Sequence, residues 1–165
     1  MYNHKGDQMS NLFHTLFSNK TAIIIRGLSG SGKSTLAQEI AGKALYHSYE
    51  VAIHETDTFF IDDNGSYNFD PSRLGDYHAE NLRLFKQSID NGTDIVINSN
   101  TNTMHWEYKD YVSYAVQNGY NIQIIDLYDN GQEDLDLHER QCHDFPLDKY
   151  DVCRERYQRE YFSDK

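Results

Sequence analysis

Apolar residues along this chain gather in short continuous runs, which lie at 21–25, 51–53, 94–97 and 122–128. Most of these residues are β-branched, and such runs are typical of strands buried on both faces of a sheet. A parallel sheet of this kind needs helices over both of its faces. The runs therefore predict four strand segments with helices between them.

Between these runs, apolar residues recur three and four positions apart, which is the spacing of one helix face. This pattern predicts helices at 34–46, 79–89, 104–117 and 149–162. The expected inner residues are Leu36, Ile40, Ala44 and Leu45, then Leu82, Phe85 and Ile89, then Trp106, Tyr111, Tyr114 and Ala115. Strands that alternate with helices predict a three-layer α/β fold with a parallel sheet of about five strands.

Three further segments lack a strong periodic pattern. Residues 1–19 are polar apart from a short apolar cluster at 12–17, which suits one helical turn in an N-terminal extension. Residues 61–76 carry Asp, Asn, Gly and Pro and predict a loop, while the polar segment 129–148 is expected to be mobile. A length of 165 residues suits one compact domain, so we expect a single domain over 20–165.

The segment between the first strand and the first helix matches Gly-x-x-x-x-Gly-Lys-Ser, the Walker A or P-loop pattern. Glycines allow a tight turn whose N–H groups point inward, and the start of the next helix favours anions. Lys33 is expected to reach the β- and γ-phosphates, and the Ser34 hydroxyl to coordinate Mg²⁺. The predicted ligand is ATP with Mg²⁺, and the predicted binding residues are Gly27, Ser29, Gly30, Ser31, Gly32, Lys33, Ser34 and Thr35.

An acidic residue, Asp57, follows the second predicted strand. In an open α/β sheet, ligands bind outside the carboxyl ends of the strands, so Asp57 is expected to face the same cleft as the glycine loop. A carboxylate there can accept the proton of an attacking hydroxyl, which is the role of the base in kinases. The alternative is that Asp57 only caps a turn.

Motor ATPases and GTPases hold Mg²⁺ through an Asp at the end of a later strand. The run 94–97 is followed by Asn98, Ser99 and Asn100, so no acid stands there. Asp126 could take that role, although Leu127 and Tyr128 after it suggest a position within a strand. A guanine-selective Asn-Lys-x-Asp is also missing, and these absences favour a kinase over a motor or a switch.

The polar segment after the fourth strand carries Arg140 and His143. Small kinases close such a segment over the triphosphate and offer an arginine to the charge that develops during transfer. We therefore expect a lid at about 129–148, with Arg140 as a catalytic residue and His143 as a weaker candidate. The alternative is a solvated charge on a helix.

The net charge of −11 limits the choice of substrate. Proteins that bind nucleic acid in general present a basic surface, so a polynucleotide here needs a local patch or the substrate is small. The best local patch would be Arg154, Arg156 and Arg159.

Composition also predicts the environment of the protein. Two cysteines and no tight cluster of metal ligands predict a reduced, cytoplasmic protein without a zinc site. No apolar run approaches the roughly 20 residues of a membrane span. The N-terminus lacks a basic start followed by an apolar stretch, so no secretory signal is expected.

Five segments, in chain order, resemble one family of enzymes. The first is the glycine loop at 26–35. The second resembles a family segment Ser-x-Asp-Asp-Tyr-Phe and has Asp57 at the catalytic acid; it is Glu55-Thr56-Asp57-Thr58-Phe59-Phe60. The third resembles the family's linker and consists of Tyr67-Asn68-Phe69-Asp70-Pro71, then Leu74 and His78.

The fourth segment resembles Asp-Asn-Thr-Asn-Thr and consists of Asn100-Thr101-Asn102-Thr103, followed by Trp106-Glu107. The fifth resembles the lid pattern Arg-Asn-x-His-Gly-Val-Pro and spans 140–146. On these segments, the chain resembles the P-loop domains of the polynucleotide 5′-hydroxyl kinases, especially the NEDD4-binding protein 2-like kinase domains. The resemblance covers roughly residues 21–160 and implies a P-loop kinase fold with a helical lid.

The chain departs from this family at several positions. The family's Asp before Asn-Thr-Asn is Ser99, and the second Asp of its acidic pair is Thr58. The Arg that holds substrate phosphate in phage and repair kinases is Phe60, which weakens the expectation of a 3′-phosphorylated end. The lid's Asn and Gly are Gln141 and Asp144.

Three functions remain open at this point. The first is an ATP-dependent kinase acting on the 5′-hydroxyl of DNA or RNA, with Asp57, Lys33 and Arg140 as catalytic residues. The second keeps this chemistry but transfers phosphate to a nucleoside, nucleotide, sugar or modified base. The third is a nucleotide-binding module that regulates a partner protein without transferring phosphate.

Overall fold

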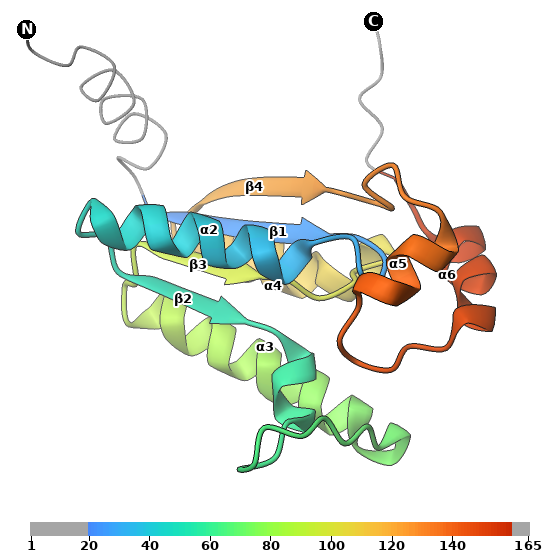
Figure 1. Cartoon of the computed structure of the whole chain (residues 1–165). Helices are drawn as coiled ribbons and strands as arrows, with labels where there is room; N and C mark the ends of the chain where they lie inside the picture. The colour runs from blue at the N-terminus through green and yellow to red at the C-terminus, as the bar shows by residue number, and fades with distance from the viewer. Residues whose placement is uncertain (1–19, 160–165) are drawn as a thin grey trace, which may run out of the picture.

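The computed structural model describes residues 20–159 and contains a four-stranded, entirely parallel sheet (Figure 1). Across the sheet, the strands follow the order β2-β3-β1-β4. Their bounds are β1 Thr21–Arg26, β2 Val51–His54, β3 Ile95–Asn98 and β4 Asn121–Asp126. The prediction of a parallel sheet is confirmed, and all four expected strand segments are present.

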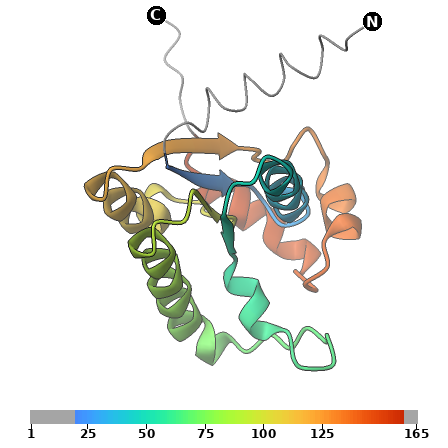
Figure 2. The same ribbon diagram turned by 90° about the vertical axis from the view of Figure 1, so that its left-hand side faces the viewer.

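The sheet is covered on both faces, as Figure 2 shows, with α2 on one side and α3 and α4 on the other. The helix bounds are α2 Lys33–Tyr46, α3 Leu74–Asp90 and α4 His105–Gln117. Alternate residues of β1 pack into the two layers: Ile23 and Ile25 face α2, whereas Ala22 and Ile24 face α3 and α4. All residues of β1 are buried, which explains its continuous apolar run.

The expected fifth strand is absent from the described part of the chain. After β4, which ends at Asp126 and not at 128, the backbone turns sharply because Tyr128, Asn130 and Gly131 all have positive φ. The polar residues that follow then form a short helix, α5 Asp134–Arg140. The segment 129–148, expected to be mobile, therefore contains a helix, whose Leu137 is fully buried against Leu28 and Tyr150.

The final helix, α6 Tyr150–Arg156, is shorter than the predicted 149–162. It ends because Tyr157 turns into extended backbone, and the next residue, Gln158, bonds elsewhere. The Gln158 N–H donates to the carbonyl of Thr103, and its carbonyl accepts from the buried guanidinium of Arg26. These tertiary bonds outweigh the helical pattern, and residues 160–162 lie outside the described range.

Arg26 closes the end of β1 beside the glycine loop. Its side chain is fully buried, lies 3.5 Å from the Asp126 carboxylate and packs between the rings of Tyr108 and Tyr157. It also donates to the carbonyl of Asn102. The buried charge thus ties β1 and β4 to the segment after β3 and to the segment after α6.

Two predicted inner residues are wrong: Trp106 and Leu45 are 66% and 62% exposed. Trp106 lies on the outward face of the first turn of α4, whereas Tyr108, Tyr111 and Ala115 face the sheet. In α2 the buried face is formed by the small residues Ala37, Ala41 and Ala44. Helical spacing alone does not distinguish a core position from an exposed apolar one.

The predicted loop 61–76 ends early, because α3 begins at Leu74 after a 3-10 turn, η2 Pro71–Arg73. A second 3-10 turn, η1 Thr56–Phe60, follows β2 and carries Asp57. A third, η3 Leu147–Lys149, precedes α6. No helix within residues 20–159 is long and apolar enough to cross a membrane. The predicted apolar cluster at 12–17 lies outside the described residues.

Candidate functional site

The glycine loop joins β1 to α2, as predicted, and packs tightly against later segments. The N–H of Gly27 donates to Thr101, and that of Leu28 donates to Tyr128. Gly30 has φ +79°, and a Cβ there would lie 2.0 Å from the carbonyl oxygen of Leu137 in α5. Only glycine fits this position, because the backbone of α5 lies directly over the loop.

The start of α2 forms the floor of the loop. Gly32 has φ 98° and precedes the first helical residue, Lys33, so the loop ends at a helix N-terminus. Ser31 is fully buried, and its Oγ has no hydrogen-bond partner among the residues described. Ser34 and Thr35 are exposed on the first turn. This arrangement of N–H groups and hydroxyls suits an anion.

Lys33 is the charged residue of the loop. Its Nζ donates to the Leu28 carbonyl at 3.0 Å. Burial lowers the pKa of Lys33 to about 8, although the carboxylates of Asp57 and Glu55 partly oppose this. The ammonium group is therefore poorly solvated, which strengthens its interaction with an anion that enters the loop.

A cavity of about 160 Å³ lies over this loop. The loop contributes Ser29, Gly30, Gly32, Lys33, Ser34 and Thr35, and facing segments contribute Glu55, Asp57, Ser99, Thr101 and residues 140–143. Six of the eight predicted binding residues therefore line one cavity. Gly27 and Ser31 lie beneath it and are buried.

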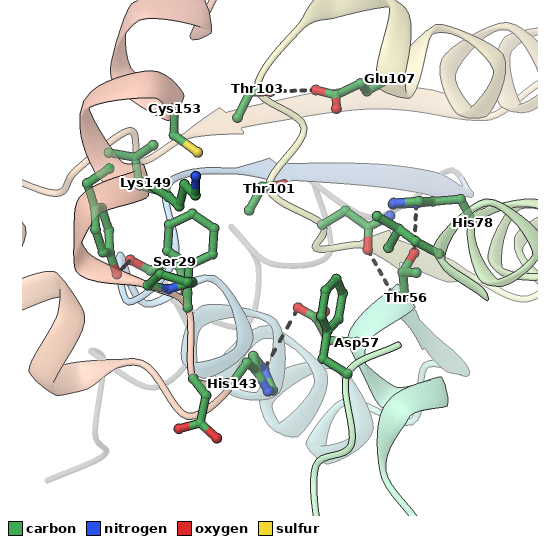
Figure 3. A pocket seen from close by; sticks show the side chains of 18 of the residues that line it. Ser29, Thr56, Asp57, His78, Thr101, Thr103, Glu107, His143, Lys149 and Cys153 are labelled. Atoms are coloured by element: carbon green, nitrogen blue, oxygen red, sulfur yellow. Dashed lines mark hydrogen bonds and ion pairs between the residues drawn. The ribbon is translucent and has the colours of Figure 1, made fainter. Parts of the chain in front are cut away.

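A second, larger cavity of about 570 Å³ adjoins the first (Figure 3). Its walls are mostly apolar and include the aromatic side chains Tyr67, Phe69, Phe145 and Tyr150. Four residues line both cavities: Ser29, Asp57, Thr101 and His143. The site is therefore a polar pocket and an aromatic pocket that meet at Asp57.

The carboxylate of Asp57 is half-exposed and contacts two residues of the aromatic pocket. One oxygen accepts a hydrogen bond from the Tyr67 hydroxyl at 3.3 Å, and the other lies 3.9 Å from His143 Nε2 (Figure 3). Burial and the nearby Asp57 raise the pKa of the Tyr67 phenol, so Tyr67 stays a donor to this carboxylate. Asp57 does not merely cap a turn, because no backbone N–H bonds to its side chain in the described structure.

Arg140 and His143, predicted as lid residues, both line the polar pocket over the glycine loop. Arg140 is the last residue of α5, lines the polar pocket and has no hydrogen bond or ion pair with the rest of residues 20–159. His143 packs against the Tyr67 ring, with centroids 4.7 Å apart. An unpaired guanidinium beside a phosphate-binding loop is available to a phosphate.

The wall behind Asp57 contains polar residues to which the sequence patterns assigned no role. Thr56 bonds through its hydroxyl to His78 Nδ1 at 3.1 Å and through its N–H to the Asn100 side chain at 2.8 Å. Burial lowers the pKa of His78, which favours its neutral form. This network fixes the turn η1, and thereby the position of Asp57. His78 lies in the first turns of α3 and Asn100 in the loop after β3, and neither polar residue gave a periodic signal.

The three arginines predicted as the best local basic patch are each paired with carboxylates; Arg154 and Arg156 lie in α6, and Arg159 follows it. Arg154 contacts Asp129 at 2.6 Å and Asp134 at 2.7 Å. Arg156 and Arg159 each lie 3.4 Å from a carboxylate, of Glu107 and Asp126 respectively. The sequence shows these arginines but does not show which carboxylates pair with them in the fold.

Asp126 is not available as a magnesium ligand. It accepts a hydrogen bond from the Tyr157 hydroxyl at 2.8 Å and lies beside two arginines, Arg26 and Arg159. It lines neither cavity. The alternative role considered for Asp126 is therefore excluded by its surroundings.

The polar pocket offers few protein ligands to a metal ion. No group of three or more His, Cys, Asp or Glu side chains within residues 20–159 could hold a metal ion alone. Mg²⁺ that binds with a nucleotide takes most of its ligands from phosphate and water and needs few protein oxygens. The exposed Ser34 hydroxyl, with the carboxylates of Glu55 and Asp57 lining the same pocket, fits that demand.

A family model described as an AAA domain matches residues 23–128, which contain β1, the glycine loop, Asp57 and β4. The chain belongs to this AAA domain family. Human NEDD4-binding protein 2 is 32% identical over 108 residues, which are 66% of this chain and 6% of that protein. The resemblance expected from the five segments is thus confirmed, although the chain spans only a small part of that relative's length.

Solved structures support the fold of this AAA domain. Kti12 from Chaetomium thermophilum, solved in complex with ADP-AlF3, superposes with a TM-score of 0.61 and 16% identity, over 84% of this chain and 80% of that chain. A chain of the Pnkp1/Rnl/Hen1 RNA repair complex gives a TM-score of 0.57 and 17% identity, over 85% of this chain and 47% of that one. The fold of this AAA domain is that of the P-loop kinases.

Proposed function

We propose that this AAA domain, taken as one kinase domain over 20–165, transfers the γ-phosphate of ATP to an alcohol, most specifically the 5′-hydroxyl of a polynucleotide. The observation that carries this proposal is the position of Asp57, which lines both pockets. One is the polar pocket over the glycine loop, from here on called the phosphate-binding pocket, and the other is the aromatic pocket. A base for phosphoryl transfer needs this position, because the attacking hydroxyl and the γ-phosphate must meet beside it.

The chemistry follows from the residues around that point. Asp57 accepts the proton of the acceptor hydroxyl, whose oxygen bonds to the γ-phosphorus as the bond to the β–γ bridging oxygen breaks and ADP leaves. Lys33 and the loop N–H groups hold the phosphate oxygens, and Arg140 approaches the same oxygens from α5. Mg²⁺, bound through Ser34, would neutralise phosphate charge.

The segment 129–148 acts as the lid in this proposal. Its helix α5 lies over Gly30 and ends in Arg140, and its loop carries His143 to within 3.9 Å of Asp57. The lid therefore contributes a wall to both pockets and excludes water from the point where they meet.

The aromatic pocket supports a terminal nucleotide as the acceptor. A volume of about 570 Å³ lies within the range of small-molecule sites. Bases stack on aromatic side chains regardless of sequence, and Tyr67 and Phe69 both line this pocket, with the Tyr67 hydroxyl bonded to Asp57. The name of one structural neighbour, an RNA repair complex, agrees with an RNA end as the acceptor.

A second candidate is a small acceptor such as a nucleoside, nucleotide, sugar or modified base. It is favoured by the pairing of Arg154, Arg156 and Arg159 with carboxylates, which leaves little free basic surface for a strand on α6. The net charge of −11 favours it as well.

The test is transfer of labelled γ-phosphate from ATP with Mg²⁺ to 5′-hydroxyl DNA, to 5′-hydroxyl RNA and to a pool of nucleosides and sugars. Labelled oligonucleotide supports the first candidate, and labelled small molecule with a bare oligonucleotide supports the second. ATP binding without transfer to any acceptor would contradict both and favour a regulatory module.

Asp57→Asn separates catalysis from binding in that assay. Loss of a general base should lower the transfer rate about 10²- to 10⁴-fold while ATP affinity stays near the wild-type value. Asp63→Asn is the matched control, because Asp63 is an exposed acid of the neighbouring loop and lines neither pocket. Equal turnover of Asp57→Asn and wild type would refute the base assignment.

A further inference from the structure

Glu55 lines the phosphate-binding pocket and takes no part in the transfer steps of the proposed function. It follows the last residue of β2, and Ser99 follows the last residue of β3. These two strands pair in parallel with His54 opposite Asn98, so the register brings Glu55 beside Ser99. The Ser99 hydroxyl donates to the Glu55 carboxylate at 2.5 Å.

The polynucleotide kinase family that these segments resemble has Ser at the position of Glu55 and Asp at the position of Ser99. In this chain the acid is Glu55 and the hydroxyl is Ser99, and the two side chains are hydrogen-bonded to each other. An acid is therefore present beside the carboxyl end of β3, although it follows β2.

Glu55 and Asp57 differ in the cavities that they line. Asp57 lines both pockets, whereas Glu55 lines only the phosphate-binding pocket, together with Lys33 and Ser34. Glu55 is thus on the nucleotide side and away from the acceptor. The negative charge of Glu55 favours the protonated form of Lys33 and so partly offsets the lowering of the Lys33 pKa by burial.

We propose that Glu55, oriented by Ser99, is the carboxylate that positions Mg²⁺ beside the nucleotide, in place of an acid after β3. This inference rests on the proposed function, because it concerns the nucleotide of the same site. A carboxylate near Ser34 accepts hydrogen bonds from water molecules on Mg²⁺ and balances the charge of the ion. The hydroxyl of Ser99 holds that carboxylate in one orientation.

The test measures ATP binding by calorimetry, with Mg²⁺ and with EDTA, and needs no turnover. Glu55→Gln keeps the shape and the bond to Ser99 but removes the charge. It should lower the Mg²⁺-dependent gain in ATP affinity about tenfold, and leave the affinity in EDTA unchanged or slightly higher. Glu39→Gln is the matched control, because Glu39 is exposed on α2 and lines neither pocket.

The double exchange Glu55→Ser with Ser99→Asp provides a second, independent measurement. Glu55→Ser alone should lose the Mg²⁺-dependent gain, and adding Ser99→Asp should restore it to within about threefold, because the acid returns from the other strand. A purely structural role for Glu55 would change the melting temperature of the protein but leave the gain unchanged.

The outcomes distinguish this inference from the proposed function. A wild-type gain in Glu55→Gln and in Glu55→Ser, with ATP bound normally, would overturn the role of Glu55 and leave the proposed function intact. Wild-type protein that binds no ATP in either condition would overturn both. Loss of the gain in Asp57→Asn, together with a wild-type gain in Glu55→Gln, would transfer the role to Asp57.

Discussion

The two pockets that meet at Asp57 are built in different ways. The phosphate-binding pocket rests on a continuous loop of the sequence, fixed by β1 on one side and α2 on the other. The aromatic pocket is assembled from the turn after β2, the loop before α3, the segment after β3, and α6 with its preceding loop. A contiguous motif can keep its chemistry while the walls around it change. The sequence motif therefore predicts the phosphate donor, whereas the phosphate acceptor depends on the pocket walls of the individual chain.

The linings of the two pockets also differ. In the phosphate-binding pocket, Lys33, Arg140 and the loop N–H groups lie with Glu55 and Asp57, so cations and anion-binding donors lie beside two acids. The larger pocket has mostly apolar walls, with charged residues of both signs among them. Selectivity for an anionic donor therefore rests on electrostatics, and selectivity for the acceptor rests on shape and stacking. Variants of each pocket should separate these two contributions.

The largest expected effect is that of Lys33→Ala. Loss of the ammonium removes the main positive charge of the loop and should lower kcat/KM about 10³-fold, with a large loss of ATP affinity. Calorimetry with ATP and the transfer assay measure the two effects. Lys43→Ala, an exposed lysine near the end of the same helix, is the control. Normal activity of Lys33→Ala would refute the assignment of the loop.

Arg140→Ala should have the next largest effect. Arg140 is proposed to contact the charge that develops on the transferred phosphate, so kcat should fall about 10²-fold while ATP affinity changes less. Steady-state kinetics with varied ATP separate the two quantities. Arg83→Ala removes an exposed arginine of α3 that pairs with Glu80 and should leave kinetics unchanged. A change confined to the acceptor KM would contradict this role, because it would place Arg140 beside the acceptor and not beside the transferred phosphate.

Phe69→Ala addresses the aromatic pocket alone. Phe69 is 51% exposed and stacks near Phe60, so its removal should cost little stability but should weaken acceptor binding. The acceptor KM should rise about tenfold, with the ATP KM unchanged, because base stacking contributes roughly 1–3 kcal/mol. Tyr46→Ala, an exposed aromatic of α2, serves as the comparison. An equal rise in the ATP KM would show that the two pockets are not separable.

The smallest effect concerns pH. Burial holds the pKa of Lys33 at about 8, and an anion in the loop would favour the protonated form. ATP affinity should therefore be constant below pH 7.5 and should fall severalfold between pH 8 and 9.5, as the free protein loses this proton. Calorimetry in buffers of different ionisation enthalpy should detect proton uptake with ATP at pH 8.5, and no uptake would contradict a lowered pKa.

The same sequence features explain how much could be predicted. The strands, their parallel arrangement and the glycine loop follow from local patterns, because a buried strand and a phosphate-binding turn each require particular residues at fixed spacing. The end of α6 was missed because Gln158 bonds to Arg26 and Thr103, which are distant in sequence. The pairing of the α6 arginines was missed for the same reason.

In the candidate site, Asp57 and Arg140 line the pocket over the glycine loop, because Asp57 follows β2 and Arg140 is the last residue of α5. Their catalytic roles stay predictions. The pairing of Glu55 with Ser99 could have been suspected from the reciprocal exchange of acid and hydroxyl, but only the β2–β3 register shows that the two side chains meet. The sequence did not show that Tyr67, Phe69 and Tyr150 line one pocket. These residues lie together in the fold but have no regular spacing along the chain.

The buried guanidinium of Arg26 has a consequence for the order in which the protein forms during synthesis. Arg26 leaves the ribosome well before two of its partners, Asp126 and the carbonyl of Gln158. A charge without its partners is costly to bury, so β1 cannot settle fully while these residues are still being added. The glycine loop, which begins at the next residue, therefore takes its final shape only after Gln158 has been translated.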